Sequence, residues 1–160
     1  MAQPDTDAPT AETVAAAMLA AVPFARTLGI SFSEVAPDGV GGYRVAAELP
    51  DREDLHNHVG GPHAGAIFSL GETASGAAVM ATFGDQLGRA VPLAVHAEIT
   101  YRKLAMGAVT ATARINRSRD EVVAELDAGE RPEFGVEVAI TRPDGAVSAE
   151  MLVVWTLRPQ

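Results

Sequence analysis

The sequence predicts an α+β protein in which an antiparallel sheet curls around one long central helix. Three observations lead to this prediction. Residues 30–50, 90–118 and 132–159 alternate apolar with polar or smaller residues, which is typical of strands with one buried face. Residues 63–84 form a long run of small and apolar residues that reads as a helix, and Gly84 ends it. Pro-Asp-Gly turns at 37–39 and 143–145 favour hairpins, and therefore antiparallel pairing.

Length and composition indicate a soluble globular protein. The 160 residues fit one domain, with 48% hydrophobic and 21% charged residues. We expect residues 1–9, which contain Pro, Asp and Thr without apolar periodicity, to form a disordered N-terminal tail. Residues 10–160 are then a single domain with an N-terminal helix.

Charge and cysteine content exclude several classes of function. The net charge of -9 argues against nucleic acid as a partner, because the phosphate backbone would be repelled. The absence of cysteine excludes disulfides, thiolate catalysis and cysteine metal sites, and it fits a cytoplasmic location. The N-terminus does not resemble a signal peptide, and no apolar run reaches the roughly 20 residues that cross a bilayer, so we expect no membrane partner.

The remaining elements follow in chain order. Thr10 begins a helix with an approximate capping box, and Gly29 ends the helical region. Two strands lie within residues 30–50, and a polar loop spans residues 51–62 before the long helix. We predict a hairpin of strands 90–105 and 107–118 around Met106-Gly107, a short amphipathic helix at 119–131 with Val122, Val123 and Leu126 on one side, and a last hairpin at 132–159.

Glu72 is an acid in the middle of the long apolar helix. A helical wheel places Ile67, Leu70, Ala74, Ala77, Ala78 and Ala81 on the sheet side, and Gly65, Ser69, Glu72, Gly76 and Val79 on the other. Small neighbours let a ligand or a second chain approach, and the resulting desolvation raises the pKa of a carboxyl group and makes it a better base or nucleophile. The alternative is a solvated glutamate on an ordinary amphipathic helix.

The start of the same helix lacks a Ser, Thr, Asp or Asn cap, since Gly60-Gly61-Pro62 precedes it. The backbone N–H groups of Ala64 and Gly65 are therefore candidates for an oxyanion hole, or else water satisfies them. Ala64 and Glu72 lie about 12 Å apart along a helix, too far for one carbonyl group to touch both. If they act together, the acid comes from a second, antiparallel copy, which requires a twofold homodimer.

The stretch "N…HAGAIFSLGETASGAA" resembles the signature of hotdog-fold acyl-CoA thioesterases, in the phenylacetyl-CoA thioesterase-like branch. Asn57, His63, Glu72 and Thr73 match in type and spacing, and the resemblance covers roughly residues 25–158. Two positions differ, because Ala64 replaces a usual glycine and Glu72 replaces the aspartate of several relatives. The chain is most similar to members with His-Ala-Gly at the helix start.

The resemblance implies a hotdog fold and hydrolysis of acyl-CoA or another acyl thioester without a metal or redox cofactor, in a homodimer or homotetramer. It implies that Glu72 is the general base or the nucleophile, that Ala64 and Gly65 hold the oxyanion, that Asn57 and His63 orient the loop, water or carbonyl, and that Thr73 assists near Glu72. We expect the acyl pocket to be lined by Phe68, Val79, Met80 and Phe83. Arg102 and Lys103, with Arg114, Arg117 and Arg119, could meet the phosphates of coenzyme A, or simply form a solvated strand edge.

Other functions remain open at this point. A dehydratase or hydratase would use His58, which precedes Glu72 by fourteen residues. The same fold could bind acyl-CoA or lipid without catalysis. His56, His58 and His63 could form a metal cluster, although no cysteine supports it. Ser69 and Ser75 lack the G-x-S-x-G setting of a serine nucleophile. The acyl group itself cannot be read from the sequence.

Overall fold

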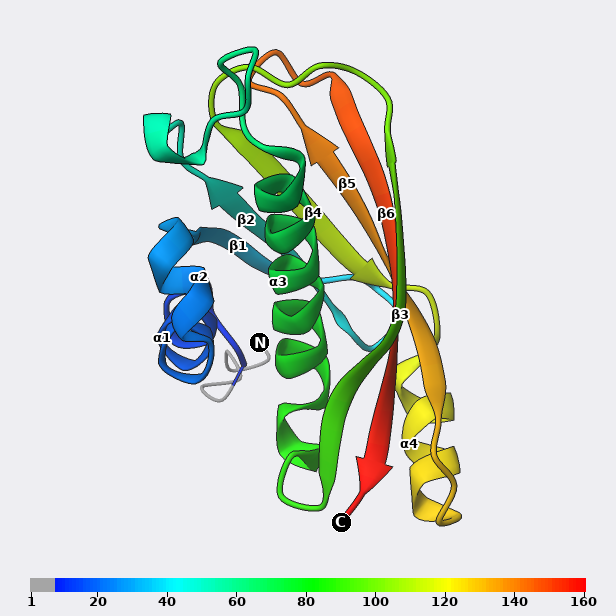
Figure 1. The fold of residues 1–160 in the computed structure, drawn as a ribbon. Helices are drawn as coiled ribbons and strands as arrows, with labels where there is room; N and C mark the ends of the chain where they lie inside the picture. Colours follow the sequence, from blue (N-terminus) through cyan, green and yellow to red (C-terminus); the bar gives the residue numbers. More distant parts are fainter. Residues whose placement is uncertain (1–7) are drawn as a thin grey trace, which may run out of the picture.

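A six-stranded antiparallel sheet, in the order β1-β2-β4-β5-β6-β3, wraps around the long helix α3 (Figure 1). The structure is a computed structural model that describes residues 8–160, so the predicted tail at residues 1–9 lies almost entirely outside the described residues. The helices are α1 (Ala11–Ala21), α2 (Pro23–Leu28), α3 (Ala64–Phe83) and α4 (Arg119–Asp127), with 3-10 turns at Glu53–Leu55 and Gly84–Gln86. The strands are β1 (Ser31–Pro37), β2 (Tyr43–Leu49), β3 (Ala90–Tyr101), β4 (Val109–Ile115), β5 (Glu133–Thr141) and β6 (Val147–Pro159). The predicted α+β architecture is confirmed.

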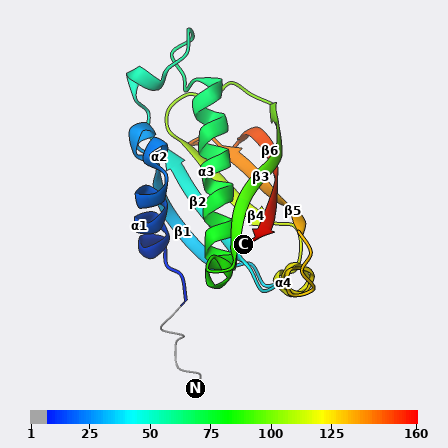
Figure 2. The ribbon, with the colours of Figure 1, turned by 60° about the horizontal axis from the view of Figure 1, so that its bottom comes forward.

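The N-terminal helices begin and end where the sequence predicts. The Thr10 hydroxyl accepts the backbone N–H of Thr13 at 3.1 Å, and the Thr10 N–H donates to the Thr13 hydroxyl at 2.9 Å, which completes a capping box. Gly29 ends α2 with φ of 71°, a left-handed conformation that favours glycine. Val14 and Met18 are buried, so α1 covers one side of α3 beside β1 (Figure 2).

Helix α3 packs its small residues against the concave side of the sheet. Leu70, Ala74, Ala77 and Ala78 are fully buried, and the three alanines let the helix approach the strands closely. At this depth Leu70→Ala would cost roughly 2–5 kcal/mol through lost apolar contacts and the cavity left behind. The helix is long and apolar enough to cross a membrane, but 67% of its apolar window is buried inside the protein, which identifies it as a core helix.

The predicted hairpin around Met106-Gly107 is wrong. Gly107 does turn the chain with φ of 78°, but β3 pairs with β6, whereas β4 pairs with β2 and β5. The segment 102–108 therefore crosses from the edge of the sheet to its centre. Strand β3 has β6 on one side and no neighbour on the other among the described residues, so it is an edge strand.

The last two strands and α4 agree with the prediction. Strands β5 and β6 form the expected hairpin, with Ala149, Met151, Val153 and Leu157 buried on one face. Helix α4 buries Val122 and Leu126. Arg119 of α4 donates to the carbonyl oxygen of Thr82 at 3.0 Å and pairs with Asp85, and so ties α4 to the C-terminal end of α3.

Candidate functional site

Glu72 lies at a small cavity beside the middle of α3. The cavity has a volume of about 210 Å³ and is lined by α1, α3, β6 and the beginning of β3 with the turn before it. Its lining consists of Met18, Val22, Glu72, Thr73, Gly76, Met80, Leu87, Pro92 and Trp155. Glu72 is the one charged residue in this lining, and the other lining residues are mostly apolar.

The Glu72 carboxyl group has no partner of opposite charge. Within residues 8–160 it forms neither a hydrogen bond nor an ion pair, and it is half-buried. Desolvation by burial raises its pKa above the ordinary value of 4.5. A desolvated carboxyl group without a partner in a cavity is a candidate functional group, because such an arrangement lowers stability and yet makes the acid a stronger base.

Buried hydrogen bonds hold the turn of α3 that carries Glu72. The indole N–H of Trp155 donates to the hydroxyl oxygen of Ser75 at 3.0 Å, and this hydroxyl donates to the carbonyl oxygen of Glu72 at 2.6 Å. Ser75 is fully buried and Trp155 is 8% exposed. Strand β6 thereby fixes the backbone at Glu72, although the sequence analysis did not single out Trp155.

His63 caps the start of α3, which corrects one expectation. Its Nδ1 accepts the backbone N–H of Gly65 at 2.9 Å, so this N–H group is not free. Among residues 8–160 the N–H of Ala64 has no hydrogen-bond acceptor. Of the two predicted oxyanion donors, Ala64 alone therefore keeps an available N–H group in this conformation.

Asn57 holds the loop that leads into α3. Its Oδ1 accepts the N–H groups of Val59 at 3.0 Å and Gly61 at 3.3 Å, and its Nδ2 donates to the Pro62 carbonyl oxygen at 3.3 Å. The loop also packs closely against the segment after β3. A Cβ added at Gly61 would lie 2.2 Å from the carbonyl oxygen of Ala105, so only glycine fits there. Asn57 thus positions the backbone immediately before the helix.

A hollow of about 290 Å³ lies on one side of the helix start. Asn57, Ala64, Tyr101, Arg102 and Lys103 are among the residues that line it, and the Tyr101 hydroxyl donates to the Ala64 carbonyl oxygen at 2.9 Å. Arg102 also bonds Glu150 at 2.7 Å. Three further arginines that the sequence analysis considered for the phosphates of coenzyme A do not line this hollow. Each pairs with an acid: Arg114 with Glu137, Arg117 with Glu125, and Arg119 with Asp85.

A second hollow, of about 260 Å³, lies on the other side of the helix start and is lined by His56, His63 and Gly65 among others. His56 pairs with Asp51 at 2.6 Å, and His58 is exposed in the loop. The described residues contain no cluster of three His, Asp or Glu side chains that could hold a metal ion. His56, His58 and His63 are therefore not brought together as a group of three in this conformation.

Within one chain the predicted site residues fall into three separate groups. Asn57 and Ala64 share the first hollow, His63 and Gly65 share the second, and Glu72, Thr73 and Met80 share the cavity. Val79 and Phe83 do not line this cavity. They are 1% and 0% exposed, and Phe83 packs on Phe134 with ring centroids 5.1 Å apart. Phe68 is half-buried against the core.

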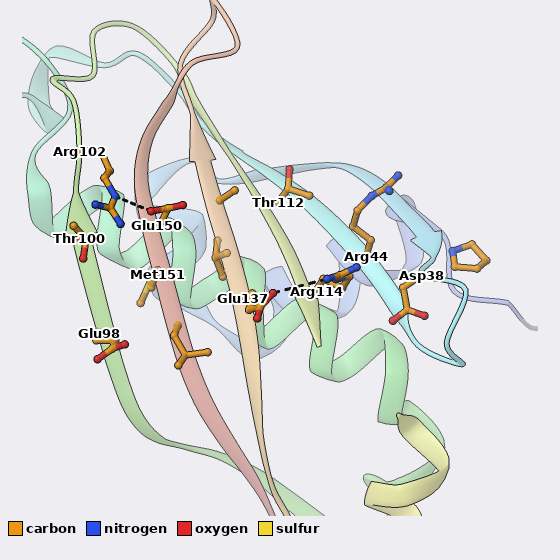
Figure 3. A pocket seen from close by; sticks show the side chains of 14 residues that line it. Asp38, Arg44, Glu98, Thr100, Arg102, Thr112, Arg114, Glu137, Glu150 and Met151 are labelled. Atoms are coloured by element: carbon orange, nitrogen blue, oxygen red, sulfur yellow. Dashed lines mark hydrogen bonds and ion pairs between the residues drawn. The ribbon is translucent and has the colours of Figure 1, made fainter. Parts of the chain in front are cut away.

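A further hollow, of about 640 Å³, lies on the face of the sheet that points away from α3 (Figure 3). Its lining carries charged side chains of both signs: Arg44, Arg102 and Arg114 with Asp38, Glu98, Glu137 and Glu150. Arg102 bonds Glu150, and Arg114 lies 3.8 Å from Glu137. Because the basic groups face acids, this surface does not single out an anion.

The chain was compared with protein families and with curated proteins. The model of one protein family, "Domain of unknown function (DUF4442)", matches residues 10–157. No curated protein matches the chain.

Solved structures give the fold. The chain is similar to Pseudomonas aeruginosa PA5026, described as a protein of unknown function and probable thioesterase, with a TM-score of 0.78 and 23% identity over 93% of this chain and 95% of that one. It is similar to a mutant form of the P. aeruginosa thioesterase PA1618, with a TM-score of 0.75 and 20% identity over 97% and 98%. It is also similar to E. coli PaaI from the phenylacetic acid degradation operon, with a TM-score of 0.68 and 17% identity over 94% of each chain. These likenesses establish the hotdog fold of thioesterase-like structures.

Proposed function

The chain belongs to DUF4442, a family described as a domain of unknown function, and we propose that it hydrolyses an acyl thioester such as an acyl-CoA. The observation that carries this proposal is the unpartnered, desolvated carboxyl group of Glu72 at a mostly apolar cavity. Asn57, His63, Glu72 and Thr73 match the phenylacetyl-CoA thioesterase-like branch in type and spacing, which supports a relationship of this chain to that branch. The lack of cysteine supports a cytoplasmic location.

Glu72 can cleave a thioester by two routes that give the same products. As a general base, its carboxylate takes a proton from water, the hydroxide attacks the thioester carbonyl, and the proton passes to the departing thiolate. As a nucleophile, the carboxylate attacks the carbonyl itself and expels the thiolate, and water then hydrolyses the resulting anhydride. In both routes the N–H of Ala64 donates to the oxygen that becomes negative. A single turnover in ¹⁸O-labelled water puts the label on Glu72 only along the second route, when water attacks the Glu72 carbonyl carbon of the anhydride.

The proposal needs a second copy of the chain, because Ala64 and Glu72 lie eight residues apart on one helix, roughly 12 Å at 1.5 Å per residue. The exposed edge of strand β3 offers a surface on which a second copy of the chain can pair. This strand is a twelve-residue edge strand with Leu93, Val95 and Tyr101 between 36% and 48% exposed, and exposed edges of this kind pair readily with another chain.

The direction of β3 also supports an antiparallel pair. Its last residue, Tyr101, contacts the start of α3 through Ala64, whereas Pro92 lines the cavity of Glu72. If two β3 strands pair antiparallel about a central twofold axis, the end of one strand lies opposite the beginning of the other. Each Glu72 would then face the helix start of the partner subunit.

The hollow beside Ala64 offers a place for the carrier of the acyl group. Lys103 and Arg102 line this hollow, and both are exposed. We assign them to the phosphates of coenzyme A, with Thr73 beside the acid in the acyl cavity.

The test is thiol release from a panel of acyl-CoA substrates by the purified protein. We expect the wild type to release free thiol and Glu72→Gln to lose at least a hundredfold in kcat, in line with the loss of a general base. Glu130→Gln makes the same charge change at an exposed position after α4, outside β3, and should keep wild-type activity. Binding of acyl-CoA without thiol release would instead indicate a binding protein, and addition of water to crotonyl-CoA would indicate a hydratase.

A further inference from the structure

The cavity beside Glu72 is bounded by residues that lie far apart in the sequence. Helix α1 contributes Met18, Val22 follows directly after it, α3 contributes Gly76 and Met80, and β6 contributes Trp155. Met18 and Trp155 are 4% and 8% exposed, so both side chains are buried walls of the cavity. The acid therefore lies at a space whose size the fold sets.

We infer that this cavity is the acyl site and that Met18, Gly76 and Trp155 limit the substrate to short aliphatic or single-ring acyl groups. The inference rests on the proposed function. Its first support is volume, since an apolar protein cavity of roughly 150 Å³ takes up benzene. A space of about 210 Å³ has room for one ring with a short linker or for a short chain, whereas most carbons of a long fatty acyl chain would lie outside its lining.

Gly76 is the position where the limit is set. A Cβ added there would lie 3.5 Å from two atoms of the Trp155 ring and 3.7 Å from Cε of Met18, which is ordinary van der Waals contact. The space at this point therefore exists because residue 76 has no side chain. An added methyl group would fill it without displacing a neighbour.

The two neighbours of Gly76 differ in stiffness. The Trp155 ring is held by its hydrogen bond to Ser75, whereas Met18 is an unbranched side chain on α1. Truncation of Met18 should therefore lengthen the cavity toward α1, and Trp155 should remain as a fixed wall. The N-terminal helix thus acts as a selector of acyl size.

The test uses CoA thioethers, which cannot be hydrolysed, and the fluorescence of Trp155, the single tryptophan of the chain. We expect butyl-CoA and hexyl-CoA to change the emission saturably and dodecyl-CoA to bind at least tenfold more weakly. Gly76→Ala should lower the affinity for hexyl-CoA about tenfold and leave the affinity for butyl-CoA unchanged. Met18→Ala should raise the affinity for dodecyl-CoA. Leu19→Ala, a truncation on α1 outside the cavity, should leave the order of the three affinities unchanged.

Three results would overturn the inference. The first is a wild-type affinity that rises steadily from butyl-CoA to dodecyl-CoA, and the second is a tryptophan emission that none of the three ligands changes. The third is a Gly76→Ala variant whose affinities for the three ligands equal those of the wild type. The outcome is separable from the proposed function. Size-limited binding without cleavage of any acyl-CoA would refute hydrolysis and leave the acyl site standing. Equal cleavage of butanoyl-CoA and dodecanoyl-CoA would refute the size limit and leave hydrolysis standing.

Discussion

Two glycines of α3, five residues apart, face different surroundings and predict opposite effects of the same substitution. Gly71 is buried against the sheet, where an added Cβ would meet Sδ of Met151 at 2.6 Å and Cδ1 of Ile140 at 3.4 Å. Gly76 faces the cavity, where the nearest contacts are 3.5 Å away. Replacing each by alanine therefore tests which side of the helix faces the sheet and which faces the proposed acyl site.

The magnitudes follow from two opposing terms. Alanine in a helix interior is more favourable than glycine by about 1 kcal/mol, and both variants gain this. At position 71 the gain is offset by overpacking, which costs about 1–3 kcal/mol. We therefore expect Gly71→Ala to lower the free energy of unfolding by about 1 kcal/mol and Gly76→Ala to raise it by about 1 kcal/mol. The difference of about 2 kcal/mol corresponds to roughly 4–8 °C in Tm for a chain of this length.

The assay is urea unfolding followed by far-UV circular dichroism, at one protein concentration for all variants because association would add to stability. Wild-type protein serves as the reference for both substitutions. Equal shifts in the same direction, or a larger loss for Gly76→Ala than for Gly71→Ala, would refute the assigned orientation of α3.

Three further predictions concern the acid and the helix cap. Because burial raises the pKa of Glu72 above 4.5, the native state holds this proton more tightly than the unfolded state, so its contribution to stability falls as pH rises through the window above 4.5. Glu72→Gln should therefore be more stable than wild type at pH 7 and lose that advantage below about pH 4.5; urea titrations across pH would contradict this if the difference stayed constant. For the same reason kcat/KM should fall in acid with a midpoint above 4.5, and a midpoint at or below 4.5 would speak against an ionised Glu72 as the catalytic group. His63→Ala should lower stability by about 1 kcal/mol through loss of the cap on Gly65, whereas His63→Asn should retain most of it, and equal thermal melts for the two variants would exclude a capping role.

Local patterns in the sequence predict most of the elements. The capping threonine at position 10, the left-handed Gly29 and the Pro-Asp-Gly turn at 143–145 act within a few residues, and the structure follows all three. The period-two and helical patterns likewise predict β5, β6 and α4, because one face of each is buried. These features depend on neighbours along the chain, which the sequence displays directly.

Strand partners depend on residues far apart, and here the sequence misleads. A turn at Gly107 predicts a hairpin, but seven residues, 102–108, separate β3 from β4 and allow the chain to cross the end of the sheet. The partner of β3 is strand β6, which begins only at Val147, after β4, α4 and β5.

The site is partly predictable for the same reason. The position of Glu72 beside small residues follows from the helical period, whereas burial of Val79 and Phe83 follows from a sheet that curls around the helix. Trp155 and Met18 approach Glu72 only through tertiary packing. The cap on Gly65 was missed because His63 is an unusual capping residue, although its Nδ1 is a sound acceptor.

The central claim is that one protomer supplies Glu72 and its partner supplies the N–H of Ala64. Ala64→Pro removes this N–H alone: proline suits the first position of a helix, and His63 already has the extended φ of -62° and ψ of 141° that a residue before proline adopts. We expect Ala64→Pro to fold as wild type and to lose about 10²–10³ in kcat, as for removal of an oxyanion donor.

The most direct test mixes Ala64→Pro with Glu72→Gln after joint refolding, with the mixed dimer verified by native mass spectrometry. In a site shared between subunits, each mixed dimer carries one intact site and one doubly altered site, and random pairing makes half of all dimers mixed. The mixture should therefore recover about a quarter of wild-type thiol release. Recovery of no activity beyond the two variants alone, with mixed dimers present, would contradict a site built from two subunits.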